Sequence, residues 1–167
     1  MAQFSVKIMR LTGSVLGENQ QGVLAALALG ADGAVIGTRF WGARESLVDR
    51  RLVEPTLAHT GDDTIRTRVI DSVRRIDWPE RYSGRVLRTT FVDRWSDDDA
   101  GLRRDLPSQG KLWQAAIETA DITVVAPLVG EAIGLIGAEE DAAGVIAMIQ
   151  ADMQDVFGHQ TGLMLPA

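Results

Sequence analysis

The residue pair Gly37-Thr38 has the types and the position that phosphate binding needs. It directly follows Ala34–Ile36, a short and continuously apolar run of the kind that forms a buried parallel strand. A glycine at the end of such a strand lets the backbone approach a ligand closely, and the amides that follow, with a threonine hydroxyl, can donate hydrogen bonds to a phosphate. An ordinary strand-ending glycine without a ligand is the alternative, and the local sequence alone favours it slightly.

A second set of glycines, at Gly13, Gly17 and Gly22, precedes the first predicted helix and could form another phosphate loop. The stretch GSVLGENQQG matches neither the G-x-G-x-x-G nor the G-x-x-x-x-G-K-[ST] pattern. Spacing alone therefore gives this second loop weak support.

The side chains that most often act as nucleophiles, bases or metal ligands give little signal. The chain has no cysteine, and its two histidines, His59 and His159, lie far apart in the sequence. The carboxylates come in runs such as 97–99 and 139–141, which are typical of helix caps and solvated turns. We therefore assign no catalytic residue and expect no metal site.

An arginine-rich stretch, residues 64–104, contains ten arginines against seven acidic residues. With Trp78, Tyr82, Phe91 and Trp95 interleaved, it has the composition of a nucleic-acid patch. The interspersed acids and the net charge of −6 instead favour a packed cover whose arginine stems lie along apolar surface.

Length and composition restrict the fold. The chain has 167 residues, of which 46% are hydrophobic and 24% charged, as in an ordinary soluble globular domain. It is shorter than a complete (β/α)8 barrel, which takes about 250 residues. We expect no signal peptide and no membrane span, and hence a cytoplasmic protein.

The elements that must position Gly37-Thr38 are a helix and a strand. Residues 20–29 are rich in alanine and leucine at helical spacing, Gly30 is placed to end that helix, and a turn at 32–33 leads into the strand 34–36. This is the second half of an α/β repeat.

Further along the chain the pattern predicts alternating helices and apolar strands. We expect helices over 45–57, 84–95, 112–120 and 139–157, strands over 64–70 and 122–127, and a loop at 107–110.

Three segments resemble the nitronate monooxygenases, also called 2-nitropropane dioxygenases. AALALGADGAVIGTRF, residues 25–40, is similar to the strand 7–helix 7–strand 8 signature of that family. TIRTRVIDSVRRIDWPERYSGRVLRTTFVDRW, residues 64–95, resembles a segment that follows the barrel in that family, and VGEAIGLIGAEEDAAGVIAMI, residues 129–149, resembles its C-terminal segment. Together the resemblance covers about Gly22–Phe157.

The resemblance implies an FMN-dependent (β/α)8 barrel in which two loops hold the FMN phosphate. Gly37 and Thr38 match the loop after strand 8. The paired glycines of the loop after strand 7 would fall at Val15 and Leu16, and Gly17 beside them is a weaker candidate for the same role. We therefore expect Gly37, Thr38 and Gly17 to bind the cofactor.

The same resemblance implies an α/β fold that is a partial TIM barrel with a mostly helical C-terminal appendage. Residues 1–41 would be the end of the FMN-binding barrel, with 1–18 divergent, and residues 42–167 would be the appendage packed on it. The G-x-x-x-G-G-H-type stretch that carries the family's catalytic histidine is not found in the sequence. The chain therefore resembles a C-terminal fragment that we expect to be inactive alone, and poorly soluble unless a missing N-terminal barrel half or a second copy covers it.

The implied reaction is the oxidation of an alkyl nitronate by O2 to a carbonyl compound and nitrite. Two alternatives stay open: a flavin-dependent enoyl-acyl-carrier-protein reductase, and a non-catalytic remnant or FMN-binding partner subunit. We expect no nucleic-acid and no membrane partner.

Overall fold

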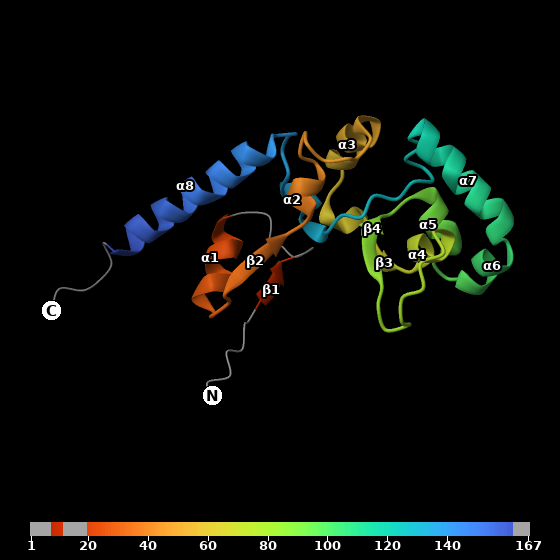
Figure 1. Cartoon of the computed structure of the whole chain (residues 1–167), viewed down its shortest axis with the longest axis horizontal. Coiled ribbons are helices and arrows are strands. Elements are labelled where there is room, and N and C mark those ends of the chain that lie inside the picture. The colour runs from red at the N-terminus through yellow and green to blue at the C-terminus, as the bar shows by residue number, and fades with distance from the viewer. Residues whose placement is uncertain (1–7, 12–19, 162–167) are drawn as a thin grey trace.

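The computed structural model describes residues 8–11 and 20–161 of the chain (Figure 1). Its elements follow one another as β1 (Ile8–Leu11), α1 (Gln20–Ala28), β2 (Gly33–Ile36), α2 (Thr38–Trp41), α3 (Arg50–Leu57), η1 (Gly61–Asp63), β3 (Thr64–Thr67), α4 (Val69–Val73), β4 (Gly84–Leu87), α5 (Thr90–Trp95), α6 (Asp99–Arg104), α7 (Leu106–Thr119), η2 (Glu131–Leu135) and α8 (Ala142–Thr161). Figure 1 shows β1, β2, α1 and α8 at one end of the molecule and α4 to α7 at the other, with α2 and α3 between them.

A β-α-β unit occupies the first end. β1 and β2 pair in parallel, with Ile8 opposite Gly33 and Leu11 opposite Ile36, and α1 is the crossover between them. Gly30 ends α1 with a φ of 87°, a left-handed conformation that costs glycine little. The prediction of a helix, a glycine stop and a short strand before Gly37 is therefore confirmed.

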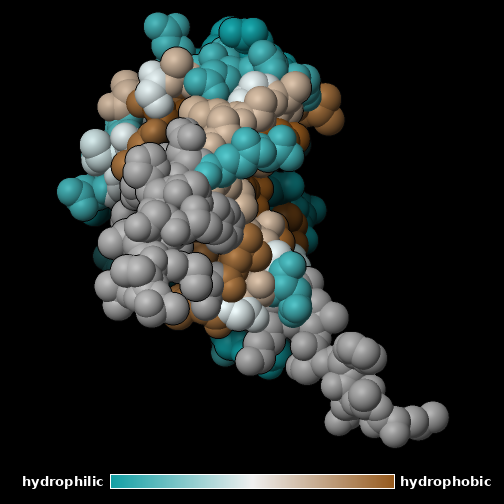
Figure 2. Space-filling view, turned by 90° about the vertical axis from the view of Figure 1, so that its left-hand side faces the viewer, coloured by the Kyte–Doolittle hydropathy of each residue, from teal (hydrophilic) through white to brown (hydrophobic). Residues whose placement is uncertain are grey.

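The strand β2 is less covered than the sequence suggests. We expected burial on both faces, but the Val35 side chain is 44% exposed. Figure 2 looks onto the end of the molecule that carries α1, β2 and α8 and shows apolar surface between hydrophilic side chains. Leu29, at the end of α1, adds a side chain that is 74% exposed.

The second sheet is an antiparallel ribbon formed by β3 and β4, with Thr64 opposite Leu87 and Thr67 opposite Gly84. The turn before β3 is held by the backbone N–H of Thr60, which donates to Asp63 Oδ2 at 2.8 Å. This hydrogen bond is the main cause that lowers the pKa of Asp63.

The largest core lies between α4, α5, α6 and α7. Val69, Val92 and Leu102 are at most 1% exposed there, and the rings of Phe91 and Trp113 pack with centroids 5.7 Å apart. Because their apolar side chains recur at helical spacing, these short helices each turn one face to a shared core. Close packing of those faces makes the helices one stable layer.

The segment around η2 joins this layer to the rest. The backbone N–H of Leu87 donates to Pro127 O at 2.9 Å, and Leu87 packs with Val129 and Ile133. A Cβ on Gly61 would lie 2.3 Å from the carbonyl oxygen of Glu131, so η1 can approach η2 only with glycine at this position.

Ion pairs hold the beginning of α8 against α2 and the segment that follows it. Arg39 is 7% exposed, and its Nη2 lies 2.6 Å from Glu140 Oε2. Arg50 pairs with Glu139, and the backbone N–H of Ala142 donates to Glu45 Oε2 at 2.9 Å. α8 therefore starts at a defined place before it runs along α1.

Two predictions in the arginine-rich stretch, one of a strand and one of a helix, are wrong. The predicted strand 64–70 ends at Thr67, whose Oγ1 accepts the N–H of Val69, and α4 begins there. The predicted helix 84–95 begins as strand β4 and becomes helical only at Thr90. In both cases a run rich in β-branched residues starts as a strand and continues as a helix, because the β3–β4 ribbon ends where the helical core begins.

Three further boundaries also differ. The predicted loop 107–110 lies inside α7, because a proline is tolerated in the first helical turn. The predicted strand 122–127 is a turn over 122–124 followed by irregular chain, and Thr123 donates to Asp121 Oδ1 in the turn. The helix predicted over 45–57 begins at Arg50, since Asp49 caps it, and hydrogen bonds from Arg51 lower the pKa of Asp49 to about 2.

The α/β class is confirmed, and the appendage predicted for 42–167 contains the β3–β4 ribbon besides its helices. Within the segment predicted to be divergent, residues 8–11 form β1, and the remaining positions before 19 lie outside the described residues. In the described part of the chain, no helix has the length and apolar character needed to cross a bilayer.

The core predicts that replacing two leucines of neighbouring helices will change the free energy of unfolding by very different amounts. Leu102 in α6 is fully buried, whereas Leu112 in α7 is 45% exposed. We expect Leu102→Ala to lower the free energy of unfolding by about 2–5 kcal/mol, because it leaves a cavity. The control Leu112→Ala should cost less than about 1 kcal/mol in the same urea titration. Equal effects would contradict the core described here.

Candidate functional site

Gly37 lies at the carboxyl end of β2, immediately before the short helix α2. Its carbonyl accepts the N–H groups of Phe40 at 3.1 Å and Trp41 at 3.0 Å, so the chain turns sharply there. Gly37 is exposed, whereas the Thr38 side chain points inward and is 5% exposed. The carboxyl ends of parallel strands are where α/β proteins place their ligands.

The Thr38 hydroxyl makes the contact that builds the site. The backbone N–H of Gly130 donates to Thr38 Oγ1 at 2.9 Å in a buried environment, across 92 positions of sequence. A hydroxyl that accepts a hydrogen bond still carries its own proton to donate. Thr38 thus links the β-α-β unit to the segment before η2, and its hydroxyl still has a proton to donate.

A hollow of about 840 Å³ opens beside Gly37 and Thr38, within the size range of small-molecule sites. Its other walls come from the β3–β4 ribbon and from the chain just before η2. The residues that matter for its chemistry are Gly37, Thr38, Arg66, Tyr82, Ser83, Gly84, Arg85, Leu128 and Gly130.

Two arginines of the ribbon give this hollow its charge. Arg85 Nη2 lies 2.8 Å from Glu131 Oε1, and its Nη1 donates to Thr64 Oγ1 at 3.0 Å. Arg66 donates from Nε and Nη2 to the hydroxyl and carbonyl of Ser83, at 3.2 and 2.7 Å. One cation is neutralised by a carboxylate, whereas the other is held by neutral acceptors.

A second hollow of about 610 Å³, largely apolar but also lined by Asp71 and Arg74, adjoins the first and shares residues 82–84 and Leu128 with it. Trp78 meets Tyr82 edge to face, with centroids 6.3 Å apart. Arg81 lies over the Tyr82 ring, 4.8 Å from its centroid. A ligand held at Gly37-Thr38 would therefore have an aromatic and aliphatic surface beside it.

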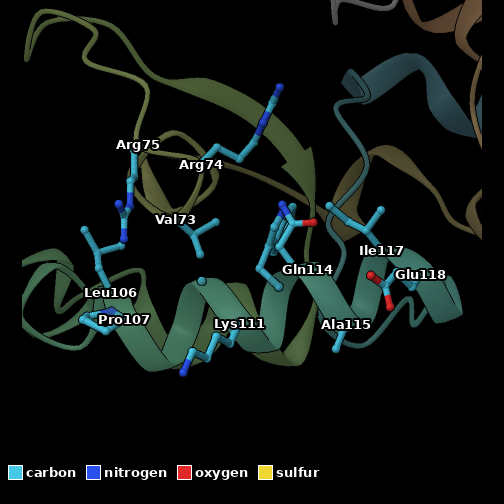
Figure 3. Close-up of a pocket in the computed structure, with 12 residues that line it drawn as sticks. Val73, Arg74, Arg75, Leu106, Pro107, Lys111, Gln114, Ala115, Ile117 and Glu118 are labelled. Atoms are coloured by element: carbon cyan, nitrogen blue, oxygen red, sulfur yellow. The ribbon is translucent and has the colours of Figure 1, made fainter.

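A third hollow, of about 820 Å³, lies elsewhere, between α4 and α7. Figure 3 shows Val73 directed toward α7 and Arg75 beside Leu106 at the start of that helix. Neither Gly37 nor Thr38 lines it, so the candidate site is the hollow at Gly37-Thr38.

The structure brings together two of the three predicted cofactor residues. Gly37 and Thr38 line one hollow, whereas Gly17 lies outside the described residues. His59 is 40% exposed with Nδ1 3.5 Å from Asp63 Oδ2, as expected of a surface histidine, and the side chain of His159 is not among those described.

Sequence reasoning named none of the residues that line the hollow together with Gly37 and Thr38. Leu128 carries no local signal for ligand binding, because it lies in an irregular segment. Arg66, Tyr82, Gly84 and Gly130 do belong to the two later family-like segments. These matching segments were the signal that could have placed them at one site.

The fold is similar to that of solved flavoenzymes. FabK from Thermotoga maritima matches with a TM-score of 0.67 at 23% identity, covering 94% of this chain and 47% of that chain. Its M276A mutant matches with a TM-score of 0.65 at 25% identity, covering 94% and 44%. FabK is a TIM-barrel flavoenzyme, so the class of protein is an α/β protein related to TIM-barrel flavoenzymes.

The curated relatives are more specific. Nitronate monooxygenase npaC of Metarhizium robertsii is 30% identical over 135 residues, covering 75% of this chain and 36% of that protein. A nitronate monooxygenase of Neurospora crassa is 28% identical over 138 residues, covering 81% and 35%. No family model matches the chain.

These matches confirm the resemblance to nitronate monooxygenases, the oxidoreductases that the sequence motifs indicate. The chain spans about a third of the length of the relatives it matches, as a C-terminal portion of such a protein would.

The hydrogen bond between Thr38 and Gly130 predicts a stability difference between an isosteric change that removes the hydroxyl and a change that keeps it. Thr38→Val removes the acceptor and leaves the buried Gly130 N–H unpaired, so we expect the free energy of unfolding to fall by about 1–3 kcal/mol. Thr38→Ser keeps the hydroxyl and should cost less. Chemical denaturation followed by circular dichroism measures both, and equal losses would contradict this role of the hydroxyl.

Proposed function

We propose that Gly37 and Thr38 hold the phosphate of FMN and that the chain is the C-terminal portion of a nitronate monooxygenase. The whole protein would oxidise alkyl nitronates with O2 to a carbonyl compound and nitrite. The proposal is supported by the curated relatives and by the position of Gly37-Thr38 at the carboxyl end of a parallel strand. Residues 1–41 would belong to the partial barrel and 42–167 to the appendage.

The observation that carries the proposal is the Thr38 hydroxyl. It is buried, oriented by the Gly130 N–H at 2.9 Å, and it lines the hollow with its proton still to donate. The exposed backbone of Gly37 allows a phosphate to approach closely. Neutral donors at the start of a turn suit a phosphate, so the residues present fit FMN.

The rest of the hollow would serve the flavin and the substrate. Leu128, Trp78 and Tyr82 would exclude water beside the ring system, and Thr38 would orient the phosphate end. Bound FMN would supply the redox chemistry that couples nitronate oxidation to O2.

A base for the reaction is not found beside Gly37 and Thr38, because the described residues that line their hollow include no histidine and no carboxylate. The adjoining hollow has one carboxylate, that of Asp71. We therefore propose that the catalytic base belongs to a barrel portion outside this chain, and that the isolated chain binds flavin without turning over substrate. The share of the relatives' length that the chain spans, 35–36%, supports this division.

The second candidate is a flavin-dependent enoyl-acyl-carrier-protein reductase. It is favoured by the structural likeness to FabK, which covers 94% of this chain. Both candidates would use the same phosphate site. They would differ in substrate and electron donor.

Flavin retention tests the phosphate site. We expect the purified chain, mixed with FMN and desalted, to keep a visible flavin absorbance band. Thr38→Val should lose most of it, because the donor to the phosphate is gone, and Thr38→Ser should keep it. Thr119→Val, on exposed α7 surface, is the matched control and should retain flavin like the wild type. A folded wild-type chain without any flavin band would overturn the proposal.

Turnover distinguishes the candidate activities. With an N-terminal barrel portion of a related nitronate monooxygenase added, we expect nitrite release and O2 consumption from an alkyl nitronate, and neither from the chain alone. NAD(P)H-dependent reduction of a 2-enoyl thioester by the same mixture, without nitrite release, would favour the reductase instead.

A further inference from the structure

Arg66 and Arg85 stand directly opposite each other in the antiparallel ribbon. Opposite residues of paired strands put their side chains on one face, where two like charges destabilise the pair. Glu131 neutralises Arg85 at 2.8 Å. Arg66 has no carboxylate partner among the described residues, so this face keeps one uncompensated positive charge.

The Arg66 side chain is nevertheless held in place. Nε donates to Ser83 Oγ at 3.2 Å and Nη2 donates to the Ser83 carbonyl at 2.7 Å. These two bonds use only part of the guanidinium, whose other N–H groups remain as donors. A planar, oriented guanidinium with spare donors is suited to a phosphate, which it can bind through two parallel hydrogen bonds.

The position of Arg66 determines which anion it can bind. It lines the same hollow as Gly37 and Thr38. Those two residues offer only neutral donors, an amide and a hydroxyl. A phosphate monoester carries close to two negative charges at neutral pH, so neutral donors alone leave its charge uncompensated.

We propose that Arg66 is the counter-ion of the flavin phosphate, and that it makes this site select FMN over unphosphorylated riboflavin. The inference rests on the proposed flavin site. It adds a residue from the appendage to a phosphate site that would otherwise consist of barrel residues only. The β3–β4 ribbon thus takes part in cofactor choice.

The test compares the affinities of the whole chain for FMN and riboflavin, measured by quenching of flavin fluorescence. We expect the wild type to bind FMN at least about tenfold more tightly than riboflavin, the size of one charge-assisted contact. Arg66→Gln should lose most of this preference by weakening FMN, while its riboflavin affinity stays as in the wild type. Arg66→Lys, which keeps the charge but not the planar fork, should fall between them.

Arg104→Gln is the matched control. Arg104 is exposed at the end of α6, lines none of the three hollows and has no side-chain ion pair, hydrogen bond or ring contact among the described residues. Its replacement changes the net charge equally and should leave both affinities unchanged. On the wild type alone, rising NaCl should weaken FMN binding and leave riboflavin binding nearly constant.

The outcomes separate the two proposals. An unchanged FMN preference in Arg66→Gln, or equal wild-type affinities for the two flavins, would overturn the role of Arg66 and leave the flavin site standing. A folded wild type that binds neither flavin would overturn the flavin site and, with it, this inference. Should Arg66→Gln fail to fold, Arg66→Lys and the salt dependence of the wild type decide the matter.

Discussion

The hydrogen bond from the Gly130 N–H to the Thr38 hydroxyl determines where the parts of this molecule meet. It is 2.9 Å long, buried, and spans 92 positions of sequence. On one side of it lies the β-α-β unit and on the other the segment that leads into η2. The segment around η2 also packs on Leu87 and η1, and Trp41 of α2 packs on the same cluster, so this bond and these contacts together set the position of the ribbon relative to the strand end. The hollow at Gly37-Thr38 exists because these surfaces are brought together there.

Charge is distributed unevenly around this junction. The chain as a whole carries a net charge of −6, yet the hollow is lined by two arginines and by no acidic side chain among the described residues. Arg85 is matched by Glu131, and Arg39 by Glu140. Arg66 is the exception, since neutral oxygens of Ser83 orient it. An acidic protein that keeps a cation in this setting is suited to receive an anion locally while it repels polyanions overall.

The neighbours in sequence and structure are longer proteins than this chain. The chain spans about a third of the nitronate monooxygenases it matches and under half of FabK, a TIM-barrel flavoenzyme. In such barrels the ligand site is shared among loops from many strands. The described part of this chain contributes one parallel pair of strands and the surface that covers it, with Val35 and Leu29 left exposed at that end. Apolar exposure of this kind marks a surface that other structure normally covers.

The sequence by itself determined the local unit: a helix that ends at Gly30, a short apolar strand, and Gly37-Thr38 after it. These features depend on neighbours within a few residues, so periodicity and glycine placement suffice to predict them. The secondary structure predicted from the sequence was wrong at 64–70 and 84–95. There a run rich in β-branched residues passes from ribbon to helix, and only tertiary packing decides the boundary. Tertiary structure alone decided that Gly130 bonds to Thr38 and that Arg66 lines the same hollow, because contacts between distant segments leave no periodic signal in the chain. The turn at Gly37-Thr38 could therefore be predicted from residue order, whereas the arginines beside it required the fold.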